Sequence, residues 1–221
     1  MFIGHFAAAY AAKRVTPRTS LGWLFAACQW PDLLWPVLCL LGVEHFHIAP
    51  GDTAFTPLAF DYYPWSHSLL MDAVWGAALG LVYLARRGDK RGAWILGALV
   101  MSHWVLDWIT HRPDMPVSLS LEHRVGLGLW NSVAATMVVE VAMFAGAVFL
   151  YDRLTAPLDR TGRLGSWILV GVLALLYFAN VFSPPPPSVV AVTVSALGIW
   201  LFVAAAAWID RHRALRAQRP A

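Results

Sequence analysis

The chain has 221 residues, of which 59% are hydrophobic and only 13% are charged. A soluble domain of this size could not bury so much apolar surface, so the composition excludes a water-soluble protein. The net charge of +3 does not indicate a nucleic-acid partner, because a small excess of arginine and lysine is typical of membrane-protein loops. The sequence therefore predicts an all-α, polytopic membrane protein whose first partner is the lipid bilayer.

The chain begins with a short, alanine-rich helical pattern over residues 2 to 14, which ends at Lys13 and Arg14. This segment is too short to cross a hydrocarbon core about 30 Å thick. We expect this half-helix either to lie in the membrane interface or to dip into the bilayer, packed against other helices.

Six apolar runs follow, each close to the roughly 20 residues that a transmembrane helix needs. The first run contains Pro31 and Pro36, which remove backbone donors and predict a kink. The long loop of residues 44 to 65 comes next and is a candidate lid over a site. We expect a site-bearing part over residues 1 to 163, and a last helix pair with a basic tail over residues 164 to 221. The runs are residues 21 to 43, 66 to 85, 93 to 109, 127 to 151, 164 to 182 and 189 to 208.

Arginine and lysine gather on one set of loops, whereas the other set carries only Arg112 and Arg124. Cytoplasmic loops of membrane proteins carry an excess of these residues, so we expect both termini to be cytoplasmic. The basic set comprises Lys13, Arg14, Arg18, Arg86, Arg87, Lys90, Arg91, Arg153, Arg160, Arg163, Arg211, Arg213, Arg216 and Arg219.

Several ionisable residues fall within the apolar runs. Charged side chains at bilayer depth are costly and usually face the bundle interior or a cavity, which makes them functional candidates. We estimate the depth of each ionisable residue by counting about 1.5 Å per helical residue from the basic end of its run. The ionisable residues of four runs and of the half-helix then lie at a similar depth in the bilayer. They are His5, Asp32, Asp72, His103, Asp107 and Glu140, with His67 and His111 above that level.

The strongest local pattern is the stripe of His103, Asp107 and His111, whose spacings of four place them on one helix face. An imidazole and a carboxylate one turn apart can bind the same divalent ion, most readily zinc, with His67 as a third ligand. In the alternative interpretation, His103 and Asp107 form a buried polar pair that pins helix packing. That alternative does not explain the ionisable groups on the other runs.

The remaining candidates have structural alternatives of their own. His5 could face the lipid headgroups, and Asp32 could cap the second half of a broken helix. Asp72 and Glu140 could orient ligands or join helices rather than bind an ion directly.

The same residues carry a resemblance to a known family, the LexA-binding, inner membrane-associated, metal-dependent hydrolases. The resemblance covers about residues 1 to 150 and implies a bacterial-type inner-membrane location. The family is distantly similar to zinc-dependent phospholipase C, and this chain departs from it in the loop of residues 44 to 65 and in the last helix pair. The motifs, in order, are Gly4-His5, Pro31-Asp32, Trp65-Ser66-His67-Ser68 and the Ser-His-Trp-Val-Leu-Asp run of residues 102 to 107. By this resemblance the expected metal ligands are His5, Asp32, His67, His103 and Asp107.

Together these observations predict a membrane-embedded hydrolase that cleaves a lipid-like ester or phosphoester with metal-activated water. Asp72 or Glu140 would orient ligands or accept the proton of the water, and His111 would bind the amphipathic substrate. The alternative is a proton or metal-ion transporter that uses the same layer. We expect few polar side chains between this layer and the basic end, which favours the enzyme.

Overall fold

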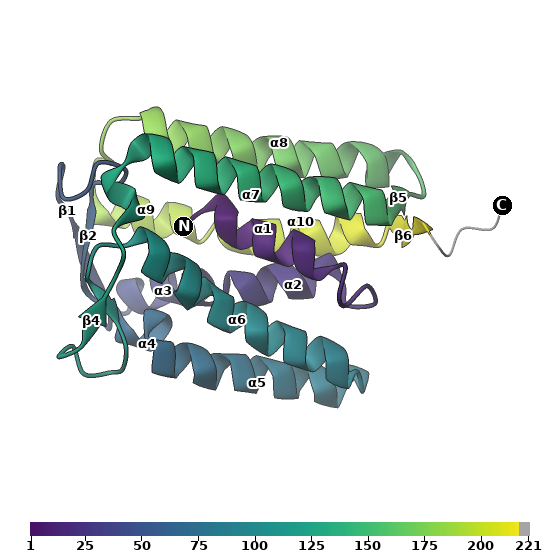
Figure 1. Ribbon diagram of the computed structural model, residues 1–221, viewed down its shortest axis with the longest axis horizontal. Helices are drawn as coiled ribbons and strands as arrows, with labels where there is room; N and C mark the ends of the chain where they lie inside the picture. Colours follow the sequence, from purple (N-terminus) through teal and green to yellow (C-terminus); the bar gives the residue numbers. More distant parts are fainter. Residues whose placement is uncertain (217–221) are drawn as a thin grey trace.

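A computed structural model of the protein describes residues 1 to 216 and is mostly helical, as the sequence predicts. Long helices lie side by side along one axis, and short hairpins close one end of the bundle (Figure 1). The helices are α1 (Ile3–Ala12), α2 (Leu21–Cys28), α3 (Trp30–Leu40), α4 (Pro64–His67), α5 (Leu69–Arg87), α6 (Lys90–Thr110), η1 (Leu129–Asn131), α7 (Val133–Leu154), α8 (Arg160–Phe182), α9 (Val189–Ala196) and α10 (Ile199–Asp210).

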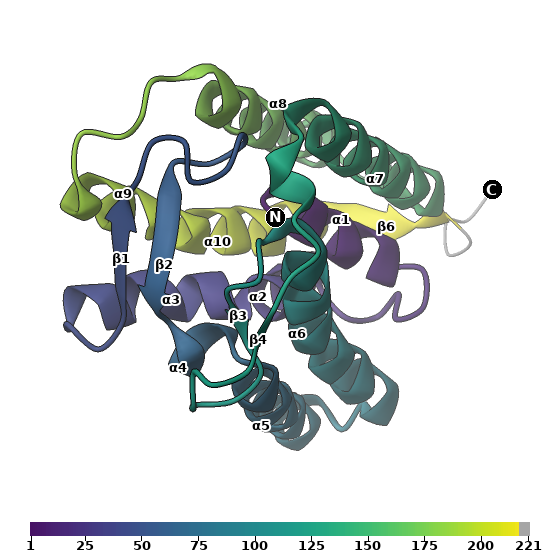
Figure 2. The same ribbon diagram turned by 60° about the vertical axis from the view of Figure 1, so that its left-hand side comes forward.

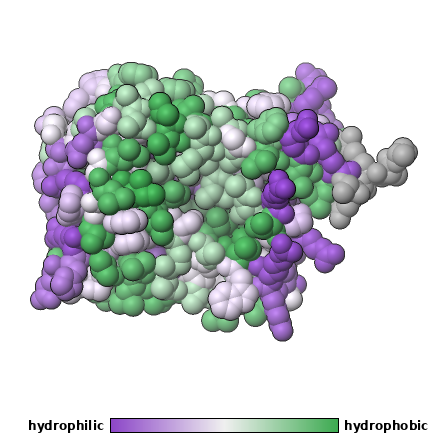
Figure 3. Space-filling model, viewed as in Figure 1, coloured by the Kyte–Doolittle hydropathy of each residue, from purple (hydrophilic) through white to green (hydrophobic). Residues whose placement is uncertain are grey.

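The surface of the bundle has the distribution expected for a membrane protein. A broad hydrophobic belt separates two hydrophilic ends (Figure 3). Within the described residues, five helical segments are long and apolar enough to cross a membrane, the last being Val189–Asp210. A sixth crossing is possible if α2 and α3 form one bent span. The expectation of about six spans therefore agrees with the structure.

The predicted kink is a complete break between α2 and α3, whose axes are bent by 56°. Pro31 has no backbone N–H and cannot continue the hydrogen-bond ladder of α2, so the helix ends at Cys28. The chain restarts at Trp30 in a new direction, and Asp32 falls in the first turn of α3. The break thus places a carboxylate inside the bundle.

The short helix α1 lies inside the bundle, against α2, α6 and α7, and not in the membrane interface. Phe6, Ala9 and Tyr10 are buried on it. It begins in the interior, where the Met1 nitrogen contacts the carboxylate of Asp107. Met1 is therefore not at the basic face, where the sequence placed the N-terminus. Which face is cytoplasmic stays a prediction.

Helices α5 and α6 pack closely because small residues face each other. A Cβ atom on Gly76 would lie 2.9 Å from the carbonyl oxygen of Gly97, and one on Gly80 would lie 2.9 Å from that of Ala93. Such small-residue contacts let transmembrane helices approach closely. The close pair fixes the position of α6, which carries His103 and Asp107.

The described residues also form three two-stranded antiparallel sheets, of which β1–β2 and β3–β4 are hairpins and β5–β6 joins distant parts of the chain. The loop of residues 44 to 65 contains the first hairpin and extends over the end of the bundle (Figure 2). Its Phe55 N–H donates to the carbonyl oxygen of Trp130 at 3.0 Å, which ties the loop to η1. The strands are β1 (His45–Ile48) with β2 (Leu58–Tyr62), β3 (Met115–Pro116) with β4 (Arg124–Val125), and β5 (Thr155–Pro157) with β6 (Arg213–Leu215).

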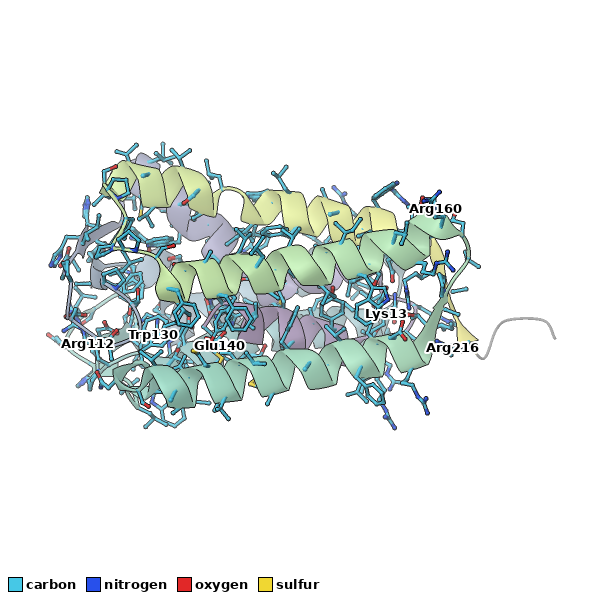
Figure 4. The ribbon with its side chains drawn as sticks, turned by 90° about the horizontal axis from the view of Figure 1, so that it is seen from above. Lys13, Arg112, Trp130, Glu140, Arg160 and Arg216 are labelled. Carbon is cyan, nitrogen blue, oxygen red and sulfur yellow. The ribbon has the colours of Figure 1, made fainter. Side chains whose placement is uncertain are left out.

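The basic residues gather at one end, as the charge pattern predicts. Lys13, Arg160 and Arg216 lie at that end, opposite Arg112 (Figure 4). Two residues of the basic set, Lys13 and Arg213, are nevertheless buried in ion pairs and do not face headgroups. Lys13 Nζ lies 2.7 Å from Asp210 Oδ2, and Arg213 Nη2 lies 2.8 Å from Asp152 Oδ1.

The last helix pair belongs to the same bundle. Helix α10 packs against α2, and the Lys13 to Asp210 pair joins it to the end of α1. The expected boundary at residue 163 falls inside the first turn of α8, and the end of the basic tail, with Arg219, lies outside the described residues.

Cysteine labelling tests which end faces the cytoplasm. In a background with Cys28 and Cys39 replaced by alanine, Arg87→Cys and Ser120→Cys place single thiols at opposite ends of the bundle. Because basic loops stay in the cytoplasm, Ser120→Cys should react with an impermeant reagent in intact cells, and Arg87→Cys only after permeabilisation. The reverse pattern would show that the topology is inverted.

Candidate metal centre

Four helices bring the five expected ligands together. They are His5 on α1, Asp32 on α3, His67 on α4, and His103 and Asp107 one turn apart on α6. Their donor atoms form two overlapping groups within 4.8 Å, one of His5, His103 and Asp107 and one of Asp32, His67 and His103. All but Asp32 are buried. Buried His and Asp groups with this spacing could hold a metal ion.

Four of the separations between donor atoms are close to those of a tetrahedral site. His103 Nε2 lies 3.2 Å from Asp107 Oδ2, and His67 Nε2 lies 3.4 Å from Asp32 Oδ1. The cross distances are 3.9 Å from His67 Nε2 to Asp107 Oδ2 and 3.8 Å from His103 Nε2 to Asp32 Oδ2. Ligands about 2.0 to 2.2 Å from zinc are about 3.4 Å apart in a tetrahedron. These four distances suit ligands of a shared ion, with Asp32 approaching His67 through Oδ1 and His103 through Oδ2.

The break between α2 and α3 orients the His103 ring. The Cys28 carbonyl oxygen lies 2.7 Å from His103 Nδ1. A carbonyl only accepts, so Nδ1 carries a proton, and in the neutral ring Nε2 keeps its lone pair. Nε2 is buried and has no hydrogen-bond partner among the described residues. A histidine held in this way by a backbone carbonyl is typical of metal ligands.

A hydrogen-bond relay that runs from Glu44 through Ser66 orients the His67 ring. Ser66 Oγ lies 2.6 Å from His67 Nδ1 and donates its own proton to Glu44 Oε2 at 2.6 Å. The serine oxygen can thus accept from Nδ1, which leaves His67 Nε2 free to bind an ion. Glu44 Oε1 also accepts from the backbone N–H groups of Trp65 and Ser66, both at 2.9 Å.

The sequence analysis missed the role of Glu44, which it treated as the start of a loop. Glu44 is buried, and this burial raises its pKa, while the hydrogen bonds from Ser66 and Trp65 oppose that shift. A lone acid at a loop boundary gives little signal in a sequence, because its partner Ser66 is 22 residues away.

His5 differs from the other two histidines. Its Nε2 lies 3.0 Å from Asp107 Oδ1, and its Nδ1 is buried without a partner among the described residues. Its ring stacks on His103, with centroids 3.7 Å apart. His5 does not face the headgroups, because it is completely buried. It packs against two ligands and could itself reach an ion through Nε2.

Asp32 is the most open member of the group, with 21% of its side chain exposed. No capping hydrogen bond from Asp32 occurs in the described part of α3, so the alternative that it caps this helix is not supported. Its carboxylate instead lines a cavity of about 110 Å³ beside His67 and Asp107.

The cavity also has an aromatic lining, from Phe60 of β2, Trp130 of η1 and His111. The loop of residues 44 to 65 therefore covers the centre, as expected of a lid. His111 does not continue the stripe on α6, because the helix ends at Thr110 and His111 is extended. Its ring still faces the cavity, 4.1 Å from the Trp130 ring, while its Nδ1 lies 3.0 Å from Asp114 Oδ1.

The two expected catalytic acids, Asp72 and Glu140, are completely buried and do not line this cavity. Glu140 Oε2 accepts from the backbone N–H groups of Phe2 at 2.9 Å and Gly4 at 3.0 Å, so it holds the start of α1 (Figure 4). Both oxygens of Asp72 lack a hydrogen-bond partner among the described residues. The position of Glu140 therefore suits orientation of α1 better than contact with a substrate.

Comparisons with known proteins identify no relative. No family model, no curated protein and no solved structure matches this chain. The motif resemblance to inner-membrane hydrolases thus has no independent support, and the chemistry of the site is inferred from its geometry.

Proposed function

We propose that this chain is a membrane-embedded, metal-dependent hydrolase that cleaves a lipid-like ester or phosphoester, with zinc as its ion. The proposal includes membership of the family that the sequence motifs resemble, the LexA-binding, inner membrane-associated hydrolases. The observation that carries it is the arrangement of His67 and His103. Each has its Nδ1 engaged and its Nε2 directed at the carboxylates of Asp32 and Asp107.

The residues of the centre have separable roles in this proposal. His67, His103 and Asp107 would hold the ion, and His5 would support Asp107 through its hydrogen bond. A divalent ion there supplies Lewis acidity and lowers the pKa of a bound water. Asp32 would complete the ligand set or accept a proton, because it is the most exposed acid and lines the cavity.

The surroundings of the centre favour an amphipathic substrate. The cavity places Leu58, Phe60 and Trp130 next to the polar group, within a bundle whose outer surface is a hydrophobic belt. A strongly polar molecule would lose hydration on entering, whereas a lipid already partitions into this layer. The hairpin β1–β2 would have to move for a larger substrate to enter.

One observation favours the alternative of a transporter. The sequence led us to expect few polar side chains toward the basic end, but the structure has several. The Tyr10 and Tyr151 rings lie 5.2 Å apart, and Tyr151 Oη donates to Asp210 Oδ1 at 3.1 Å. Asp210 in turn pairs with Lys13. A proton pathway could use such a series of groups.

Metal analysis tests the centre itself. Detergent-purified protein should contain stoichiometric zinc, and His103→Ala or Asp107→Asn should remove it. Added zinc at 100 times its Kd should stabilise the native state by about 2.7 kcal/mol, and affinity should fall as pH is lowered because ligands must be deprotonated. His47→Ala is the control, because His47 pairs with Asp61 on the exposed hairpin. Equal metal content in all variants would contradict the proposal.

Glu44 gives a second test, of ligand orientation. Glu44→Gln weakens the relay through Ser66 to His67, and we expect zinc affinity to fall by about 10-fold to 100-fold. Competition with a chelator measures this affinity. The matched control is Glu122→Gln, since Glu122 is exposed in an outer loop. An unchanged affinity in Glu44→Gln would show that the relay does not support the centre.

Activity is tested in liposomes with phospholipids and lipid-linked phosphates. Zinc-loaded protein should release product, and Asp107→Asn should not, because it lacks the ion. If Asp32 accepts a proton, Asp32→Asn keeps zinc and loses turnover; if Asp32 is a ligand, it loses both. Turnover only of a small water-soluble ester would contradict the lipid substrate, and proton or metal flux without turnover would favour the transporter.

A further inference from the structure

A second concave feature lies away from the metal centre, between α8 and α10. It is a groove of about 520 Å³. Ile168 of α8 is 63% exposed in it and Leu201 of α10 is 71% exposed. Both helices belong to segments that are apolar enough to cross a membrane, so the groove opens toward lipid. Its other apolar walls include Leu164, Val172, Phe202 and Trp208.

The groove lining combines a small side chain with a close contact between the two helices. Ala205 of α10 presents only a methyl group, and Gly165 of α8 lets the Ile209 side chain approach, 3.2 Å from where a Cβ atom would lie. Along α8 the lining runs from Arg160 to Val172, which is about 18 Å at 1.5 Å per residue. One leaflet contributes about 15 Å of hydrocarbon, half of the core thickness. The groove therefore extends one leaflet deep from the basic end.

The end of the groove at the bundle surface carries an unpaired positive charge. Arg160 lines it and lies at the basic end (Figure 4), and it has no ion pair among the described residues. The neighbouring Asp159 is engaged elsewhere, since it accepts from the Gly162 N–H at 2.8 Å and lies 2.6 Å from His212 Nδ1. A free guanidinium is well suited to bidentate binding of a phosphate group.

The dimensions indicate what can occupy the groove. About 520 Å³ spread over about 18 Å leaves a mean cross-section of about 30 Å². A helix about 10 Å wide has a cross-section of about 80 Å², so the groove cannot enclose another transmembrane helix. A single hydrocarbon chain is slim enough. Trp208, 48% exposed beside the basic end, has the amphipathic ring that residues at the headgroup level commonly have.

We propose that this groove binds one anionic phospholipid from the leaflet at the basic end. One acyl chain lies along α8 and α10, and the phosphate contacts Arg160. The bound lipid fills the space between the two helices and stabilises their packing. This site is separate from the metal centre and does not depend on the proposed hydrolase activity.

Native mass spectrometry with two lipids tests this site. Delipidated wild-type protein should bind one phosphatidylglycerol with at least 10-fold preference over phosphatidylcholine, and its melting temperature should rise on binding. Arg160→Gln should remove the preference, and Ala205→Phe should remove binding because its ring fills the groove. The controls are Arg153→Gln and Ala204→Phe, which alter exposed residues at the same end and on the same helix outside the groove lining.

The outcomes separate the possible occupants. Equal phosphatidylglycerol binding by wild type, Arg160→Gln and Ala205→Phe would overturn the proposal. A change of oligomeric state in Ala205→Phe, without a change in lipid binding, would instead make the groove a contact between copies and would also overturn it. Zinc content and turnover are measured in the same preparations and should stay unchanged, so failure here leaves the metal centre unaffected.

Discussion

The structure depends most on the break between α2 and α3. Pro31 cannot donate to the helical ladder, and the interruption releases the Cys28 carbonyl to accept from His103 Nδ1. The same break turns the chain so that Asp32 enters the bundle beside His67. A continuous transmembrane helix would satisfy its own carbonyls and would leave His103 without this partner. The break therefore both orients one candidate ligand and supplies another.

The other elements around the centre hold charged groups that a membrane interior would otherwise reject. Glu140 fixes the start of α1 through two backbone N–H groups, which places His5 against Asp107. Glu44 fixes His67 through Ser66. Each buried polar group costs free energy unless it is paired, so most of this network consists of groups that satisfy one another. His103 Nε2 makes no hydrogen bond to the described residues but lies 3.2 Å from Asp107 Oδ2, and an ion between the two atoms would bind both.

The bundle separates two kinds of surface with different chemistry. Its interior collects imidazoles and carboxylates under the hairpin β1–β2, where a small cavity leads to them. Its outer surface is apolar and ends in cations, an arrangement that suits contact with lipid tails and phosphate groups. In our two proposals a lipid is the substrate at the first surface and a structural ligand at the second. The two roles use different residues and can be tested separately.

The sequence by itself determined the features that follow from composition and spacing. The apolar runs predict the long helices, Pro31 predicts the broken span, and the basic loops predict that the cations share one end. The pattern of ionisable residues at one depth includes four of the five residues that meet in the structure, because charge within a membrane needs partners. It also includes Asp72 and Glu140, which stay outside the cluster, and the set of five with His67 came from the motif resemblance. These features depend on local sequence or on the cost of burying charge.

The tertiary structure alone decided which atoms meet. The sequence could not show that Glu44 supports His67, that Glu140 holds α1, or that His111 leaves the helix after Thr110. Nor could it choose between an interfacial and a buried α1. The sequence gives the depth of a residue along its helix. Whether two residues touch also depends on how each helix is rotated about its axis and on which helices are neighbours. Those are set by packing, such as the approach of Gly76 to Gly97, and the packing depends on the whole bundle at once.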